Sequence, residues 1–360
     1  MSAQGILPRI RGTDRFPYWP VIGVLVFLLV LVGIAALGAG AVHLSWTQII
    51  DVFAKYLGLT QSELSLSRQE EIVLVSIRLP RIVAGMVIGA ALALAGAATQ
   101  GLFRNPLADP GLIGVSSGSA LGAVVAIVAH TKVRLFLPEI SGIGLPMVTA
   151  FLGGLLVSMI VHQGSVRQNQ PSMSRMLLVG IAVNALCSAI TGWLTFQASE
   201  AQLRSITFWS LGSLANLNWN ITLMLLAVSL PAAVMVIRCA QPLNVLLLGE
   251  AEAHHLGINV RYVRQTVVIA TALLVGSSVA AVGMVAFVGL VVPHLGRLLV
   301  GPHHRILFPV AALIGAVLLP AADILARTVI APAELPIGIV TAVMGAPFFL
   351  WLIWKNDHGV

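Results

Sequence analysis

Only a few residues of this 360-residue chain are spaced in a way that could support catalysis. Residues 114–118 read GVSSG, which matches the GxSxG pattern of a serine nucleophile, here Ser116. A nucleophile elbow needs a strand before the serine and a helix after it, and this apolar segment has no strand pattern. Gly114, Gly118 and Gly122 recur every four residues, a spacing that lets two membrane helices pack closely. The pattern therefore favours helix packing over a hydrolase active site.

Residues for metal, nucleotide or proton chemistry show no such spacing either. The nine histidines form no HExxH motif and the two cysteines are far apart, so we expect no metal site and no cofactor in this chain. No lysine follows a glycine, so the phosphate-binding GxxxxGK[ST] loop is missing. Asp323 lies four residues before Arg327 in an apolar segment, where a local ion pair is expected. Any ATP that drives this protein would therefore bind, with its Mg²⁺, to another chain.

The composition indicates that most of the chain lies in lipid. Apolar residues make up 58% and charged residues 9%, whereas soluble proteins carry about 25% charged residues. The net charge of +7 comes from bases scattered between apolar runs, which does not resemble a nucleic-acid-binding surface. A helix needs about 20 apolar residues to cross a bilayer, and the uncharged runs predict an all-α protein with ten spans. These cover about 21–42, 82–103, 110–130, 140–161, 176–199, 219–237, 264–282, 285–300, 306–326 and 336–354.

The basic residues predict how these spans are oriented. Ten spans place both termini on one side of the membrane, and twelve of the 20 basic residues lie on that side. The excess predicts that both termini are cytoplasmic. Residues 1–360 then form a single transmembrane domain, with a cytoplasmic segment at 1–18, an outer loop at 43–81 that contains a helix at about 46–58, and a cytoplasmic loop at 239–261.

The cytoplasmic loop 239–261 has a pattern of its own. Its apolar-polar stretch at 243–256 is interrupted at Gly249 and ends at Gly257, and glycine is favoured just after a helix. We expect two short helices outside the bilayer. They could lie in the membrane interface as amphipathic helices or dock a cytoplasmic partner. On the outer side, Arg78 and Arg81 precede the second span, where they could anchor the helix to headgroups or meet acids on a partner.

Several motifs together resemble the FecCD-type permeases of bacterial ATP-binding-cassette importers, which take up iron-siderophores, haem and cobalamin. They are RLPR at 78–81, GLFRNPLADPG at 101–111, GVSSG at 114–118, FVGLVVPH at 287–294, Asp323 with Arg327, and ELPIG at 334–338 followed by GAP at 345–347. The motifs occur in the family's order over nearly the whole chain. The resemblance implies a cobalamin-permease-like fold in the bacterial inner membrane, where the outer loop 43–81 is periplasmic.

The resemblance also implies partners. It implies a homodimer in lipid, two cytoplasmic ATPase subunits that hydrolyse ATP, and a periplasmic substrate-binding protein, while this chain does no covalent chemistry. In the family, the loop that matches 244–257 couples the permease to the ATPase. The residues that carry this pattern here are Gly249, Glu250, Ala253, Leu256 and Gly257. The resemblance thus tips the interpretation of 239–261 towards docking.

Two further sets of site residues follow from the resemblance. In similar permeases, arginines that match Arg78, Arg81 and Arg327 meet acidic residues on the binding protein. The translocation path of the family runs along the dimer interface and is lined mainly by the fifth span. On that basis the candidate path residues are Asn184, Ser188 and Thr191.

The cargo is predicted from residues 202–214, QLRSITFWSLGSL, which look like the haem-permease branch. We expect haem, with ferric siderophore second and cobalamin third. The rival class is an ion-coupled secondary transporter, which would need coupling-ion ligands at a broken helix. The break expected at 289–293 offers no acid. A membrane scaffold would fit the composition but would leave the coupling-loop pattern unexplained.

Overall fold

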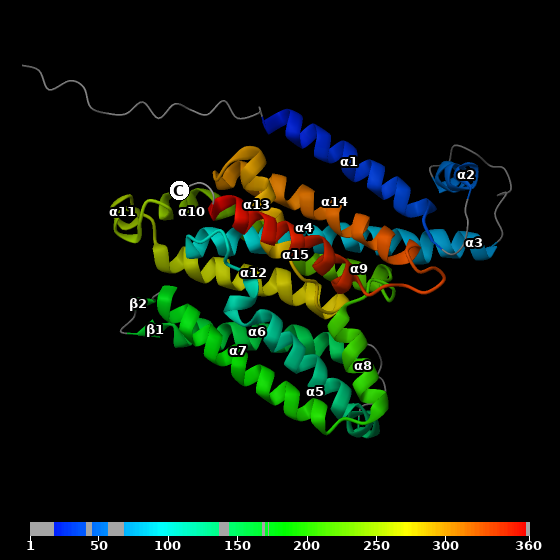
Figure 1. Cartoon of the computed structure of the whole chain (residues 1–360), viewed down its shortest axis with the longest axis horizontal. Coiled ribbons are helices and arrows are strands. Elements are labelled where there is room, and N and C mark those ends of the chain that lie inside the picture. The colour runs from blue at the N-terminus through cyan, green and yellow to red at the C-terminus, as the bar shows by residue number, and fades with distance from the viewer. Residues whose placement is uncertain are drawn as a thin grey trace, which may run out of the picture.

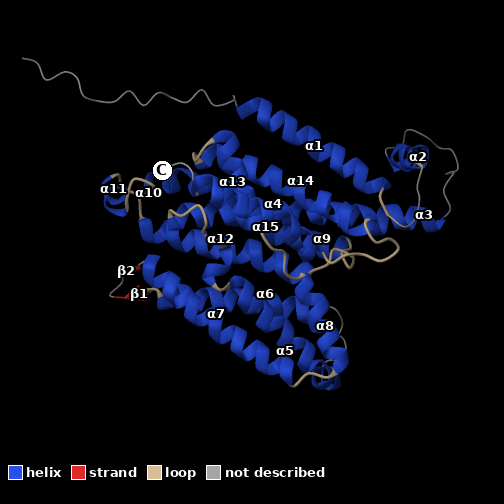
Figure 2. Ribbon diagram, viewed as in Figure 1, coloured by secondary structure: helices blue, strands red, loops and turns tan. Residues whose placement is uncertain are grey.

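Apolar helices make up almost all of the described chain. The structure, a computed structural model, describes residues 18–40, 45–56, 68–136, 144–167, 170–171 and 173–357. The expected cytoplasmic segment before Tyr18, residues 41–42 at the end of the expected first span, and residues 43–44 and 57–67 of the expected outer loop lie outside the described residues. The all-α prediction is confirmed (Figure 2), since the strands of the described part are two residues each, β1 (Val166–Arg167) and β2 (Gln170–Pro171), paired antiparallel.

The helices are named in chain order (Figure 1). They are α1 (Tyr18–Gly38), α2 (Trp46–Tyr56), α3 (Arg68–Ile72), the π-helical turn η1 (Val73–Arg78), α4 (Leu79–Phe103), the 3-10 turn η2 (Pro110–Ile113), α5 (Val115–Phe136), α6 (Gly144–Gly164), α7 (Met173–Phe196), α8 (Glu200–Leu211), α9 (Trp219–Arg238), α10 (Ala240–Leu246), α11 (Glu250–His255), α12 (Val260–Val282), α13 (Val288–Val300), α14 (His304–Thr328) and α15 (Ile337–Asp357).

Seven helical segments in the described residues are long and apolar enough to cross a membrane. They comprise α1, α4 with the α3 and η1 segment before it, α6, α7, α9, α12 and α14. Three shorter apolar helices lie at Val115–His130, Val288–Val300 and Ile337–Trp351. Each expected span has a helix at its position, while the count of ten membrane crossings stays a prediction.

The helices form two groups that meet at α12 (Figure 1). Helices α1, α4, α13 and α14 pack together on one side, and α5, α6 and α7 on the other, while α12 contacts α4, α9, α5 and α6. Most of α4 and α12 is buried, whereas little of α7 is. Helices α10 and α11 lie at one end of the assembly, which is called the α11 end below (Figure 1). Helices α2 and α3 lie at the opposite end, which is called the α2 end (Figure 1).

Glycines bring the packed helices into backbone contact. A Cβ added to Gly96 would overlap the carbonyl oxygen of Gly289 in α13, and one added to Gly122 would overlap the carbonyl oxygen of Thr149 in α6. The predicted role of these glycines in close packing is confirmed for Gly118 and Gly122. Gly114 differs, because it has a φ of 84° and ends η2 before α5 begins.

Helix α8 begins after Ser199, which forms a capping box with Gln202. One helix boundary differs from the sequence expectation. The break expected around Pro293 lies before that residue, at 283–287, and Pro293 is inside α13. Proline has no N–H to bond the carbonyl four residues earlier, and here that carbonyl belongs to Gly289 and faces Gly96.

Candidate functional site

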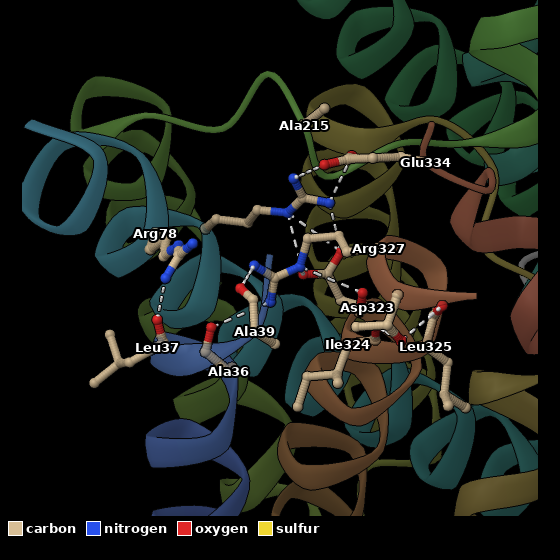
Figure 3. Close-up of polar contacts among 12 residues, drawn as sticks. Ala36, Leu37, Ala39, Arg78, Ala215, Asp323, Ile324, Leu325, Arg327 and Glu334 are labelled. Carbon is tan, nitrogen blue, oxygen red and sulfur yellow. Dashed lines mark hydrogen bonds and ion pairs between the residues drawn. The ribbon is translucent and has the colours of Figure 1, made fainter. Parts of the chain in front are cut away.

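A buried ion cluster lies at the α2 end, where α4 and α14 meet. Arg81 on α4 donates to Asp323 at 2.8 Å and to Glu334, in the segment before α15, at 2.9 Å. Asp323 also pairs with Arg327, one turn along α14, at 3.1 Å. The predicted pair of Asp323 and Arg327 is confirmed, and Figure 3 shows these two side chains pointing toward each other. Two arginines therefore share one buried carboxylate, which offsets the cost of desolvating their charges.

The same cluster holds the C-terminal end of α1. The guanidinium group of Arg327 donates to the carbonyl oxygens of Ala39 at 3.1 Å and Ala36 at 3.4 Å, and Arg78 donates to the carbonyl of Leu37 (Figure 3). The last carbonyls of a helix lack partners within it and carry a partial negative charge. Arginines from α14 and η1 supply these partners, so α1 is fixed to the core at this end.

The structure thus brings together the three arginines predicted to meet a binding protein. Arg81 and Arg327 are each 6% exposed and Arg78 is 4% exposed, and all three donate to groups inside this chain. A carboxylate on a partner would have to displace those internal contacts to reach them. The more open member of the cluster is Glu334, whose side chain is 39% exposed. The sequence analysis included Glu334 only as part of the ELPIG motif. The docking role of the three arginines stays a prediction.

At the α11 end, the two short helices predicted for the cytoplasmic loop are confirmed as α10 and α11. Gly249 and Gly257 flank α11 with φ angles of 131° and 78°, a region that side chains other than glycine adopt with strain. Ala253 is the buried residue of α11, whereas Leu256, which follows the helix, is 63% exposed. Of the predicted coupling residues, two therefore set the turns, one packs inward, and Leu256 is available to a partner.

Glu250, the remaining predicted coupling residue, binds inside the chain. Its Oε1 lies 2.9 Å from Nη2 of Arg264 in α12 and 3.9 Å from Nη2 of Arg104 at the end of α4. The side chain of Arg264 is 1% exposed, whereas those of Glu250 and Arg104 are each 40% exposed. The half-exposed carboxylate of Glu250 therefore forms ion pairs with the buried Arg264 and the exposed Arg104.

Helix α10 is held separately, by Asn244. The side-chain oxygen of Asn244 accepts from the backbone N–H of His304 at 2.9 Å and lies 2.8 Å from Nδ1 of the same residue. Because the first N–H groups of a helix lack internal partners, Asn244 caps the start of α14. The ring of His304 packs against Gly101, where any Cβ would overlap it. Helix α10 is thus fixed to α14 and α4.

The three candidate path residues lie along one groove of about 530 Å³. It is lined by Gly111, Ser116, Ser117, Ala120, Asn184, Ser188, Thr191, Gly192, Thr195 and Met284. Asn184 donates to the carbonyl of Gly111 at 3.1 Å and accepts from the hydroxyl of Ser117. Asn184 therefore ties α7 to η2 and α5, and the role of the groove as a path stays a prediction.

A neighbouring groove contains an acid that the sequence interpretation missed. This groove of about 600 Å³ shares Ser116 and Met284 with the first and is also lined by Asp109 and Phe287. Burial raises the pKa of the Asp109 carboxyl above its ordinary value, and the N–H of Gly111, which donates to it at 2.7 Å, lowers that pKa in part. From sequence, Asp109 was simply a turn residue before proline, and nothing in its spacing indicated a groove. Within the described residues no three His, Cys, Asp or Glu side chains gather as metal ligands would.

Known proteins match this chain over almost its full length. The family model described as the FecCD transport family matches residues 28–355. The hemin transport system permease protein HmuU of Yersinia pestis is 42% identical over 336 residues, which cover 93% of this chain and 96% of that protein. The vitamin B12 import system permease protein BtuC of Salmonella newport (strain SL254) is 41% identical over 291 residues, 81% of this chain and 86% of that protein.

A solved structure has the same fold. It is a chain in an inward-facing conformation, assigned to the metal-chelate type of ABC transporter, with a TM-score of 0.81 and 34% identity over 94% of this chain and 100% of that one. The family match and this likeness cover the helices that carry both polar ends and the groove. The chain therefore belongs to the FecCD transport family of ABC permeases.

Proposed function

We propose that this chain is the permease of an importer that moves haem across the bacterial inner membrane. The observation that carries the proposal is the similarity to the hemin permease over 93% of the chain, compared with 81% for the cobalamin permease. The segment 202–214 lies in this region and includes most of α8. With α5, α6 and α12, α8 lines a pocket of about 770 Å³ that combines Phe208 and Trp209 with Gln202 and Ser205. Aromatic faces beside polar groups suit a large planar, amphipathic cargo.

The proposal includes a second copy of the chain. Helix α7 exposes a row of large apolar side chains, namely Leu178, Ile181, Leu186, Trp193 and Phe196. The groove with Asn184, Ser188 and Thr191 lies on the same helix. A second copy packed on α7 would cover the row and enclose the groove between two chains, and this supports the homodimer and the path residues together.

The energy source and the cargo supply come from other proteins. We assign the exposed α10 and α11 segment, with Leu256, to an ABC ATPase that binds ATP and Mg²⁺, and the α2 end to a periplasmic binding protein. This orientation places the α11 end in the cytoplasm. Nucleotide and loaded binding protein each favour one state of the groove, so transport is a shift between states open to opposite sides. The chain contributes the groove and holds no nucleotide itself.

The test is transport by the purified complex in liposomes. The chain is coexpressed with its ATPase subunit, reconstituted, and supplied with haem, a ferric siderophore or cobalamin, each with a matching binding protein. ATP hydrolysis and uptake stimulated by the haem-loaded binding protein support the proposal. Stimulation by siderophore or cobalamin would replace the cargo and keep the importer. Uptake driven by an ion gradient without ATP or ATPase would overturn the proposal in favour of a secondary transporter.

A further inference from the structure

Helices α10 and α11 are joined by a short segment around Gly249. Helix α10, directly before it, is fixed to α14 through Asn244 and His304. Between the two helices, Gly249 has a φ of 131°, and the short segment around it can absorb a change in backbone angles as hinges do. Movement of α11 relative to α10 is therefore possible without moving α14.

Glu250 is the first residue of α11 beyond this hinge. Its carboxylate lies 2.9 Å from Nη2 of the buried Arg264 and 3.9 Å from Nη2 of Arg104. The carboxylate thus faces the permease and leaves the exposed surface of α11 to Leu256. A charge that points inward in this way is better placed to carry movement into the chain than to bind an ATPase.

Arg104 begins the elbow between α4 and α5, residues 104–114. Its own backbone is left-handed, with φ 51° and ψ 30°, and its N–H bonds back to the end of α4. Hydrogen bonds between residues close in sequence fold the elbow. The backbone N–H groups of Leu107 and Ala108 donate to the side chain and the carbonyl of Asn105. Those of Gly111 and Leu112 donate to the side chain and the carbonyl of Asp109, and that of Gly114 donates to the carbonyl of Gly111. These bonds form two consecutive turns, 105–108 and 109–114, which follow one another directly in the chain.

The far end of the elbow reaches the groove on α7. The carbonyl of Gly111 accepts from Asn184 at 3.1 Å, and Asn184 in turn accepts from Ser117 of α5. Contacts at both ends of the elbow therefore connect Glu250, through Arg104 and the chain of the elbow, to the candidate path residue Asn184.

We propose that Glu250 is a positioning residue that transmits movement of α11 to the groove through Arg104 and the elbow 104–114. The inference rests on the proposed role of α10 and α11 as the ATPase contact. It assigns the buried pair of Glu250 and Arg264 to holding α11 against α12, and the exposed pair of Glu250 and Arg104 to moving the elbow.

The first test separates transmission from folding. Arg104→Gln removes the link to the elbow and keeps the pair with Arg264. Because Arg104 and Glu250 are both 40% exposed, the thermal midpoint should change little. We expect the amount of cargo moved per ATP hydrolysed in liposomes to fall by up to about fivefold, the most that an exposed pair worth about 1 kcal/mol can carry. Glu250→Gln should lower it at least as far, whereas the control Arg238→Gln, at the exposed end of α9, should leave it within about twofold.

The second test follows the movement itself. Spin labels are placed in separate complexes at Leu107 in the elbow and at His255 at the end of α11, after Cys187 and Cys239 are replaced by alanine. In the unmutated complex the electron-spin spectrum of each label should shift between the nucleotide-free and ATP-bound states. In Arg104→Gln, the His255 label should still shift and the Leu107 label should not.

The outcomes distinguish this inference from the function on which it rests. A Leu107 label that still shifts in Arg104→Gln, or a normal transport-to-hydrolysis ratio in that variant, overturns the transmission role and leaves Glu250 as a structural partner of Arg264. Loss of the His255 shift in Glu250→Gln would instead make Glu250 an ATPase contact and also overturn it. A His255 label that never responds to nucleotide contradicts the proposed coupling role of α11 and the inference with it.

Discussion

At the α2 end Arg81 and Arg327 share the buried carboxylate of Asp323, whereas at the α11 end Arg264 and Arg104 share Glu250, whose side chain is 40% exposed. The arrangement is the same, two arginines on one acid, but the surroundings differ. The α2 cluster also binds the carbonyls that end α1 and is supported by Glu334. The α11 cluster holds a six-residue helix beside a glycine hinge.

The difference in burial indicates different purposes. Breaking a buried ion pair leaves an uncompensated charge and costs several kcal/mol, while exposed pairs are worth about 0–1 kcal/mol. The α2 end is therefore built to stay in one arrangement. The exposed arm of the α11 cluster can open and close at little cost, as expected for the part that an ATPase moves.

The largest effect should follow from removing the shared acid at the α2 end. Asp323→Ala leaves Arg81 and Arg327 buried without that carboxylate, and we expect a loss of about 3–5 kcal/mol in the free energy of unfolding. Thermal unfolding of the purified chain in detergent measures it. Glu334→Ala is the matched control, and its loss should be clearly smaller because its side chain is 39% exposed. Equal losses in the two variants would show that burial does not distinguish them.

A backbone contact between the two ends should give the next largest effect. Gly96→Ala places a methyl group on the carbonyl of Gly289, so α4 and α13 must separate. Overpacking of this kind costs about 1–3 kcal/mol, measured as a lower unfolding midpoint. Gly192→Ala, on α7 with nothing within 4 Å of the added Cβ, should leave the midpoint unchanged or slightly raised. A drop in the control as large as in Gly96→Ala would contradict the packing described for α4.

A smaller effect on stability, with a larger one on transport, is expected in the groove. Asn184→Ala removes the hydrogen bond to Gly111 and the one from Ser117, at a cost of about 1 kcal/mol each. Because these bonds connect α7 to the elbow, the variant should lose a larger fraction of its uptake rate than of its free energy of unfolding. Ser188→Ala, on the same groove, should keep that connection and most of the uptake. Comparable loss of uptake in both variants would favour a lining role for these residues over a connecting one.

The smallest effect concerns Asp109. Its folded-state pKa is raised by burial, so the folded protein binds a proton more tightly than the unfolded chain, and stability falls as pH rises above the ordinary value of 3.8. Asp109→Asn removes this term and keeps a side-chain oxygen for the turn. The variant should match the parent at low pH and become more stable than it as pH rises. A variant that is less stable at neutral pH would show that the charged form is the favoured one.

Local features of the fold were predictable from sequence, and the buried clusters were not. The apolar runs predicted the helix positions, the glycine spacing predicted a close helix contact without naming its partner α6, and the four-residue spacing predicted the pair of Asp323 with Arg327. The contact of Arg81 with Asp323 joins residues 242 positions apart, and no local pattern reports it. Arginines at a membrane edge are usually solvated, so their burial here, and the carbonyls at the end of α1 that Arg78 and Arg327 bind, became visible only in the fold.

The account predicts that ATP moves the α11 end and leaves the α2 end in place. Pulsed electron-spin measurements on the reconstituted complex can compare two label pairs within one chain, His255 with Leu299 at the α11 end and Ile50 with Val329 at the α2 end. The first distance should change between the nucleotide-free and ATP-bound states, and the second should stay the same. A change at the α2 end as large as that at the α11 end, or no change at the α11 end, would contradict it.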